Sequence, residues 1–347
     1  MSLSEGQQAL ERARSSYAAG EFDRAHADFE KAIACDATCA RAYVGRGNVC
    51  YHRGDLDAAQ SDYGIAIQLD PRDAAGYHNR ALVFFHSDRF ADAVADITFA
   101  LECEGADRAA CLYLRGCCLA NLAQFDSAVL DFSQALCYAP DEPTAYLFRG
   151  TWLARGGRLE EAVVDLDTSI RRGFYVADSF AWRGYVLSLL GDHARANTSF
   201  CVALHIDPEN ANTYVLYGNA EYHRRRFKTA IVYCEHAIAL DPSNVYALSC
   251  RGLALAALGR YDEAICNCTE AVVQSPSEAD AYYCRALVWY DMGEFNKAIE
   301  DLSHSVDLRP YAEAFRRRGQ AWFALRDAAR ARDDFRRAQL LAKGIRE

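Results

Sequence analysis

The sequence lacks the features that would place it in a membrane or a secretory pathway. No run of about 18 apolar residues occurs, so no membrane-spanning helix is expected. Residues 1–8 are polar and lack the basic-then-apolar order of a secretory signal. Neither a membrane segment nor an export signal is therefore predicted, and the cytoplasm is the expected location.

The sequence also lacks the short motifs of common enzyme classes. No P-loop, dinucleotide fingerprint, nucleophile elbow or metalloprotease helix motif occurs. Cys35 and Cys39 are spaced like metal ligands, but no second pair lies nearby in the sequence. We therefore expect no catalytic residue, no metal site and no cofactor, and we predict that the protein is not an enzyme.

Cysteine is abundant, with 14 residues at mostly irregular spacing through a long, apolar-rich chain. That distribution favours free thiols in a reducing compartment over a disulfide framework. The net charge of −10 argues against a nucleic-acid backbone as the main partner. Residues 312–347 carry ten Lys/Arg and five Asp/Glu, a charge of +5 that leaves −15 for residues 1–311. Such a basic end serves solubility or meets an acidic surface, such as that of a second copy.

What the sequence does contain is a repeat of 34 residues. Short segments such as Leu-Gly-Arg-Tyr (258–261) and Met-Gly-Glu-Phe (292–295) set its register. Two of the repeats deviate in length by one residue, which a turn can absorb. The ten repeats are 6–39, 40–73, 74–108, 109–142, 143–176, 177–210, 211–244, 245–278, 279–311 and 312–345.

Small residues recur at three positions when each repeat is numbered from 1 to 34. Position 8 is Gly or Ala in all ten repeats, position 20 is always Ala, and position 27 is Ala or Ser. A glycine inside a helix costs roughly 1 kcal/mol relative to alanine, so its recurrence needs a packing reason. We infer that two helices approach each other too closely at these positions for larger side chains.

Large side chains and prolines complete the pattern. Aromatic or large apolar residues recur at positions 4, 17 and 24, as in Tyr146, Phe227 and Phe200. Six of the seven prolines fall at position 32, where proline ends a helix. The pattern predicts an all-α chain with two antiparallel helices in each repeat.

This frame of small residues and proline resembles the tetratricopeptide repeat family over nearly the whole chain, from Gly6 to Ala342. The resemblance implies one right-handed superhelical solenoid across residues 1–347. It also implies that the first helix of each repeat lines a concave groove and that the second helix lies outside. In the last repeat, position 28 changes from aliphatic to Gln339, so the final helix is expected to cap the array.

A charged pattern accompanies the small residues. Position 7, commonly leucine in the family, is Arg in nine repeats, and position 23 is Asp in seven. Repeat 7 lacks both and has Tyr217 and Tyr233 instead. This matched change predicts a structural Arg–Asp pair between the two helices of a repeat. The pairs are Arg12–Asp28, Arg46–Asp62, Arg80–Asp96, Arg115–Asp131, Arg149–Asp165, Arg285–Asp301 and Arg318–Asp334.

The family resemblance implies that positions 2, 5, 6, 9, 12 and 13 line the groove. Aromatic side chains there suit the apolar anchors of a partner segment, and three histidines predict a ligand-contacting patch. The candidate groove residues are Asn48, Tyr51, His52, His78, Asn79, Phe85, His86, Tyr113, Phe148, Trp182, Tyr185, Asn219, Tyr222, Tyr246, Tyr283 and Tyr290.

One specialised family function can be weighed from the sequence. Family members that grip the acidic C-terminus of heat-shock chaperones use a lysine, asparagines and a further basic pair. Asn48 and Asn79 match the asparagines, but Val44, Ala110 and Leu114 stand where the basic residues belong. The sequence therefore argues against that clamp.

These observations predict a non-catalytic scaffold that binds a protein or peptide in its groove, with no nucleic acid and no membrane as partner. Two alternatives stay open. The chain could be a self-assembling structural protein that pairs its terminal repeats as a homo-oligomer, or a regulatory module of a larger complex.

Overall fold

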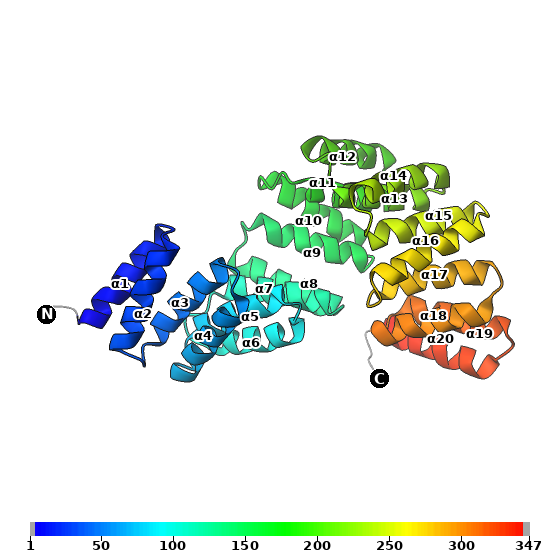
Figure 1. The fold of residues 1–347 in the computed structure, drawn as a ribbon. Coiled ribbons are helices and arrows are strands. Elements are labelled where there is room, and N and C mark those ends of the chain that lie inside the picture. The colour runs from blue at the N-terminus through cyan, green and yellow to red at the C-terminus, as the bar shows by residue number, and fades with distance from the viewer. Residues whose placement is uncertain (1–3, 343–347) are drawn as a thin grey trace. The chain divides into compact units, whose positions relative to one another are not determined.

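A computed structural model describes residues 4–342, and the chain is all-α (Figure 1). It contains 20 helices in this range and no strand. The predicted end of repeat 10 at residue 345 lies outside the described residues. The first helices of the repeats are α1 (Glu5–Ala18), α3 (Ala40–His52), α5 (Ala74–His86), α7 (Arg108–Asn121), α9 (Pro143–Arg155), α11 (Ala177–Leu189), α13 (Ala211–His223), α15 (Val245–Ala257), α17 (Ala279–Asp291) and α19 (Ala312–Ala324). The second helices are α2 (Phe22–Cys35), α4 (Leu56–Leu69), α6 (Phe90–Glu102), α8 (Phe125–Tyr138), α10 (Leu159–Arg171), α12 (His193–Ile206), α14 (Phe227–Leu240), α16 (Tyr261–Gln274), α18 (Phe295–Leu308) and α20 (Ala328–Ala342).

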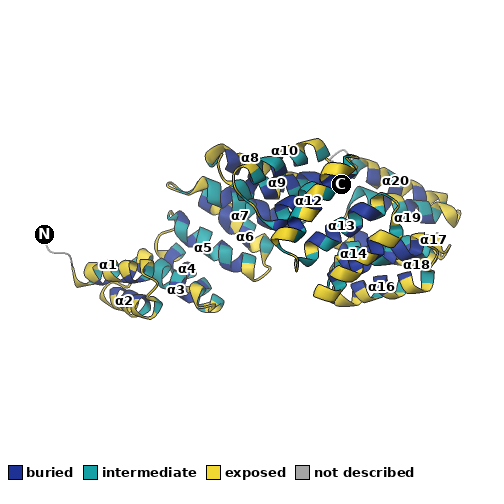
Figure 2. Ribbon diagram, turned by 90° about the horizontal axis from the view of Figure 1, so that it is seen from above, coloured by how far each residue is buried: buried dark blue, intermediate teal, exposed yellow. Residues whose placement is uncertain are grey.

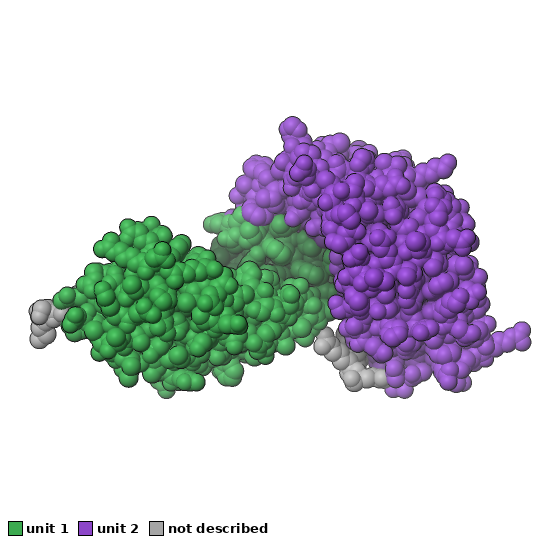
Figure 3. All heavy atoms as spheres, in the orientation of Figure 1, with its two compact units in different colours: residues 1–158 green, residues 159–347 purple. Residues whose placement is uncertain are grey.

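The chain divides into two compact units, residues 1–158 and 159–347 (Figure 3). Within each unit, the two helices of a repeat pack as a hairpin, and each hairpin packs against the next. The predicted all-α fold of tandem helix hairpins is confirmed. Among the residues that the structure describes, no helix is both long and apolar enough to span a bilayer.

The hairpins are held by close helix approach at the small residues. All ten alanines at position 20 are at most 1 % exposed. A Cβ atom added to Gly47 would lie 2.7 Å from the ring of Tyr63, and one added to Gly116 would lie 2.9 Å from the ring of Phe132. Both distances are shorter than a carbon–carbon contact allows. In these two repeats the glycine therefore lets the aromatic ring at position 24 reach the backbone of the first helix.

The first helices form one continuous face in each unit. Consecutive first helices contact each other from α1 to α9 in one unit and from α11 to α17 in the other. No two consecutive second helices within a unit make comparable contact. Figure 2 shows buried and exposed stretches alternating along the same helices, as expected when each helix packs on one side. We call the face built by the first helices the inner face.

The turn inside every repeat has one residue in the left-handed backbone conformation, at position 15. Its φ is positive in all ten repeats, between 56° and 85°. Six repeats place glycine there, and the others use Asp88, Ala123, Arg225 and Arg326. The next residue donates its backbone N–H to the carbonyl five residues earlier, as Gln124 does to Leu119 at 2.8 Å. This pattern closes the helix end with a left-handed residue, which favours glycine.

Replacing Ala123 by glycine should therefore stabilise the protein. Ala123 has φ 57°, a conformation that costs an L-residue roughly 1–2 kcal/mol, partly offset by the greater freedom of glycine in the unfolded chain. Ala123→Gly should raise the free energy of unfolding by about 0.5 kcal/mol, measured by urea denaturation. Ala95→Gly, at an exposed site within α6, is the matched control and should lower it by about 1 kcal/mol. A loss of stability in both variants would contradict this account of the turn.

Candidate functional site

Two sets of candidate residues can be located: the Arg–Asp pairs between the helices of a hairpin, and the residues of the inner face. In five repeats, the arginine at position 7 donates two hydrogen bonds of 2.6–2.9 Å to the carboxylate of the aspartate at position 23. The carboxylates are buried, with at most 5 % of each aspartate exposed. These pairs are Arg46–Asp62, Arg80–Asp96, Arg115–Asp131, Arg285–Asp301 and Arg318–Asp334.

The first and fifth repeats differ from these five. Arg12 lies 3.6 Å from Asp28, and its side chain is 48 % exposed, so this pair is looser. Arg149 and Asp165 belong to different compact units, and their pairing stays a prediction. Within its own unit, Arg149 donates a hydrogen bond to the hydroxyl of Ser133 at 3.2 Å.

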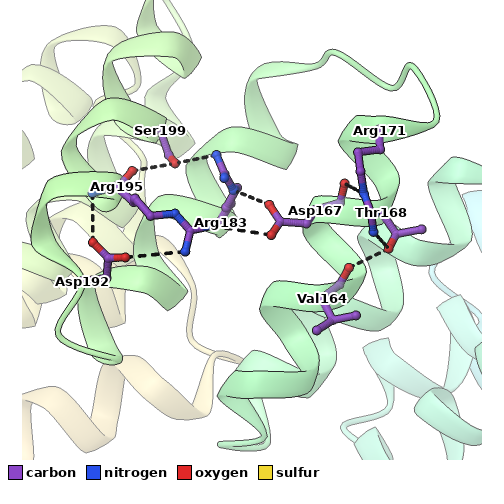
Figure 4. A network of polar contacts seen from close by, with 8 residues as sticks. All are labelled: Val164, Asp167, Thr168, Arg171, Arg183, Asp192, Arg195 and Ser199. Atoms are coloured by element: carbon purple, nitrogen blue, oxygen red, sulfur yellow. Dashed lines mark hydrogen bonds and ion pairs between the residues drawn. The ribbon is translucent and has the colours of Figure 1, made fainter.

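Repeats 6, 7 and 8 lack the aspartate, and each replaces the pair differently. In repeat 6, Arg183 lies 2.6 Å from Asp167 of α10 and donates to Ser199 at 3.3 Å (Figure 4). In repeat 8, the Nε atom of Arg251 donates to the side-chain oxygen of Asn267 at 2.6 Å. In repeat 7, the rings of Tyr217 and Tyr233 stack with centroids 4.0 Å apart, and Tyr217 also stacks on Phe200 of repeat 6 at 4.2 Å.

Several of these arginines also bridge to the preceding repeat. The oxygen they reach belongs to position 25, on the second helix before them. Arg115 donates to Thr98 at 3.4 Å, and Arg318 donates to Ser303 at 3.1 Å. Ser133 and Asp167, described above, occupy the same position. The sequence analysis did not predict this contact between repeats, although the polar side chains at position 25 indicate it. The arginine therefore joins two helices of its own repeat and, at these junctions, one of the repeat before.

The inner face of residues 1–158 carries a chain of aromatic and histidine rings. His52 stacks on Phe22 with ring centroids 5.2 Å apart. The ring centroid of Tyr51 lies 6.0 Å from that of His52 and 5.7 Å from that of His86. The rings of His86 and Phe85 have centroids 5.6 Å apart. His52 and His86 are exposed. The structure thus brings four of the candidate groove residues into one row along repeats 1–3.

Three other candidates in this unit are tied to neighbours inside the protein. Asn79 donates a hydrogen bond to Asn48 at 3.0 Å. His78 is half-buried, and its Nδ1 atom lies 3.6 Å from the sulfur of Cys111 in repeat 4. His78 therefore packs between repeats, which differs from the expectation that it faces the groove beside His52 and His86. Further along, Tyr113 contacts Phe148 with ring centroids 5.6 Å apart, and Phe148 is exposed.

On the inner face of residues 159–347, Trp182, Tyr185 and Tyr222 are half-buried. Trp182 and Tyr185 meet edge to face at 5.9 Å, and Tyr222 contacts Phe227 at 5.6 Å. Burial raises the pKa of Tyr222 and raises that of Tyr283 to about 12.

The remaining candidates of this unit are less clustered. The hydroxyl of Tyr246 donates to Glu278 at 3.0 Å. Tyr290 contacts Phe295 at 5.3 Å, and Asn219 is half-buried. Most aromatic candidates of this unit are therefore half-buried, and Tyr246 is exposed.

A hollow on the inner face of repeats 1–3 was not selected from the sequence. It has a volume of about 390 Å³ and is lined by residues that include Arg14, Tyr17, Arg41 and Asn48. Only Asn48 was a candidate, because the sequence reading favoured aromatic, amide and histidine side chains over arginines. In the part of the chain that the structure describes, no three His, Cys, Asp or Glu side chains are placed to hold a metal ion.

Comparison with known sequences gives a single family. A model of the tetratricopeptide repeat matches residues 10–59, 113–173, 250–303 and 283–344. Two related repeat models match residues 47–87 and 233–265. The comparison with curated proteins found no match.

Similar solved structures include three with TM-scores above one half. A tetratricopeptide repeat protein from Parabacteroides merdae ATCC 43184 is 14 % identical, covers 77 % of this chain and 98 % of its own, and gives a TM-score of 0.55. PilW, a type IV pilus biogenesis factor, is 18 % identical over 62 % of this chain and 100 % of its own, with a TM-score of 0.55. A monomeric mutant of IFIT1, solved with m7Gppp-AAAA, is 14 % identical, covers 86 % of this chain and 77 % of its own, and gives a TM-score of 0.59. At sequence identities this low, the structural similarity shows that the fold is shared and nothing about function.

Removing one partner of a buried ion pair should cost more than removing both. Arg285 and Asp301 form such a pair, and the hydrogen bonds to Asp301 raise the pKa of Arg285. Asp301→Ala leaves a buried cation without a partner and should lower the free energy of unfolding by about 3 kcal/mol. The double variant Arg285→Leu/Asp301→Leu should lose less than half of that. Urea denaturation of both proteins tests this, and equal losses would refute the structural role of the pair.

The burial of His78 predicts a pH dependence of stability. Burial lowers its pKa below the usual value of 6.5, so the unfolded chain binds a proton that the folded chain does not. The free energy of unfolding should fall as the pH drops through about 6.5 and level off below the lowered pKa. His78→Gln should reduce this fall, measured by urea denaturation at pH 8 and pH 5. His193→Gln, at an exposed histidine, should leave it unchanged; the same profile for wild type and His78→Gln would disprove the assignment.

Proposed function

Because the chain belongs to the tetratricopeptide repeat family, we propose that it is a non-catalytic scaffold that binds a segment of a partner polypeptide along its inner face. The family supports a protein-interaction scaffold in general, and the matching models indicate no enzyme family. The binding of a particular segment in the groove is the proposal.

The observation that carries the proposal is the concentration of aromatic side chains on the face where first helices meet. Trp182, Tyr185, Tyr222 and Tyr290 all lie on first helices and are only partly buried. Aromatic rings of this kind offer large contact area at low conformational cost, and tyrosine adds a polar tip. An extended or helical partner segment with apolar anchors suits such a face.

Nucleic acid is the less suitable partner. IFIT1 shares the fold and was solved with m7Gppp-AAAA, so the fold itself does not exclude RNA. This chain, however, has a net charge of −10, and binding to a phosphate backbone depends on neutralisation by Lys and Arg. The charge supports a polypeptide partner.

The proposal treats the ten repeats as one continuous right-handed solenoid. Its support is the 34-residue register, which continues without a break through repeat 5, where the two compact units meet in the sequence. The cytoplasm is the proposed location. All 14 cysteines are free, which suits a reducing compartment.

Truncating three aromatic residues of the inner face should abolish partner capture. Trp182→Ala/Tyr185→Ala/Tyr222→Ala removes the anchors, so proteins recovered with the wild type and identified by mass spectrometry should be lost from the variant. The matched control is Val232→Ala/Leu240→Ala/Val273→Ala, at exposed apolar residues of second helices, which should keep the same partners. Circular dichroism melts show whether each variant is folded. Capture by a folded triple variant equal to that of wild type would count against groove binding.

A further inference from the structure

Four cysteines of repeats 7–9 occupy two related positions of the 34-residue repeat. Cys234 and Cys268 stand at position 24, on second helices, and Cys250 and Cys284 stand at position 6 of the repeat that follows, on first helices. Cysteine therefore fills both positions at two consecutive junctions, between repeats 7 and 8 and between repeats 8 and 9. At every other junction at least one of the two positions holds a different residue.

The side chains at these two positions touch at other junctions as well. The rings of Phe132 and Phe148 stack with centroids 6.1 Å apart. A Cβ atom on Gly45 would lie 2.2 Å from the ring of Phe29. Both contacts join position 24 of one repeat to position 6 of the next. The register therefore brings the two side chains together across the interface between neighbouring repeats.

Cys234 and Cys250 make this contact with two thiols. Helix α14, which carries Cys234, packs against α15, which carries Cys250. The two thiols hydrogen-bond to each other, and this bond, together with burial, raises the pKa of Cys250. Cys234 is 0 % exposed and Cys250 is 3 % exposed. The two sulfur atoms therefore lie side by side in the interface between repeats 7 and 8.

The packing around Cys234 keeps its sulfur in this place. A Cβ atom on Gly218 would lie 3.0 Å from that sulfur, so the sulfur rests against the backbone of α13. Two sulfurs that already touch on packed helices need little movement to form a disulfide. Because the two thiols are held together, each meets the other at a far higher effective concentration than any thiol in solution.

We propose that Cys234 and Cys250 are a modification site, at which hydrogen peroxide forms a disulfide that joins α14 to α15. One sulfur, as its thiolate, attacks the peroxide, the O–O bond breaks, and a sulfenic acid and water form. The second sulfur then attacks the sulfenic sulfur, an S–S bond forms and a second water leaves. The two sulfurs together lose two electrons to the peroxide, and the two thiol protons end in water.

The surroundings of the pair set how readily it reacts. The thiolate, and not the thiol, is the nucleophile, and the raised pKa of Cys250 keeps its thiol protonated near neutral pH. The first step is therefore slow. The second step is fast, because the neighbouring thiol captures the sulfenic acid before a thiol from solution arrives. The pair thus responds to sustained oxidation and stays reduced otherwise.

The disulfide would join two repeats that otherwise only pack. In a solenoid each repeat contacts only its neighbours, and the helices beside this bond, α13 and α15, carry Tyr222 and Tyr246 of the inner face. The bond closes a loop between residues sixteen apart in the sequence and so restricts the unfolded chain. Oxidation should therefore oppose the separation of repeats 7 and 8. This inference goes beyond the proposed scaffold function and does not depend on it.

The test maps disulfides in the full chain. The protein is reduced, freed of reductant and kept with hydrogen peroxide for several hours, and remaining thiols are then blocked with N-ethylmaleimide in denaturant. Cleavage after glutamate separates the two cysteines at Glu235, so mass spectrometry without reduction detects their linked peptides. We expect Cys234–Cys250 to be the main disulfide and dithiothreitol to remove it. The oxidised protein should unfold at a temperature about 4 °C above that of the reduced protein.

Two variants accompany the wild type. Cys250→Ala should lose both the linked peptides and the gain in unfolding temperature. Cys118→Ala removes another cysteine that is 0 % exposed and should keep both. Circular dichroism melts of the reduced proteins show whether each variant is folded.

The peptide map of the wild type decides the proposal even if Cys250→Ala does not fold. An unlinked Cys234–Cys250 pair after sustained oxidation would overturn it, whether the two sulfurs are still thiols or have become sulfinic acids. A main product that links either cysteine to a different partner would overturn it too. A linked protein without a higher unfolding temperature would contradict the restraint on the junction.

Discussion

The close approach of two helices at residues without large side chains is the constraint on which this fold depends. At position 8 a Cβ on glycine would meet a side chain of the second helix, such as the ring of Tyr63 opposite Gly47 or the sulfur of Cys268 opposite Gly252. The alanines at position 20 are buried in every repeat. Because packing leaves no room there, each hairpin has one preferred geometry, and stacking copies of it produces the inner face where the candidate binding residues lie.

Much of this arrangement could be read from the sequence, because its causes repeat. The spacing of small residues gave the hairpins, and the sixteen-residue separation between Arg and Asp pointed to pairs that the structure brings together, such as Arg80 and Asp96. The replacement of both charges by Tyr217 and Tyr233 in repeat 7 was visible in the same way, and the two rings stack. When the same two positions contact each other in every repeat, their residue types recur together, and this recurrence is visible in a single sequence.

The contacts that could not be predicted occur once or cross between repeats. His78 has the position number of a groove residue, yet its ring lies against Cys111 of the next repeat. Arg183 finds Asp167 in the preceding repeat after losing its own aspartate. The hollow of repeats 1–3 depends on side chains from several helices, such as Arg14 of α1, Phe29 of α2 and Arg41 of α3. Such combinations follow from three-dimensional neighbours, which repeat numbering does not supply.

The left-handed residue in each hairpin turn has a consequence for how the array can vary. Four of the ten turns carry a side chain where glycine would be unstrained, and relative to glycine they together cost on the order of 2 kcal/mol. The free energy of unfolding of a typical folded domain is only about 5–15 kcal/mol. Charged residues such as Arg225 and Arg326 can therefore replace glycine in only a few of these turns. Further replacements would require substitutions elsewhere that first raise the free energy of unfolding.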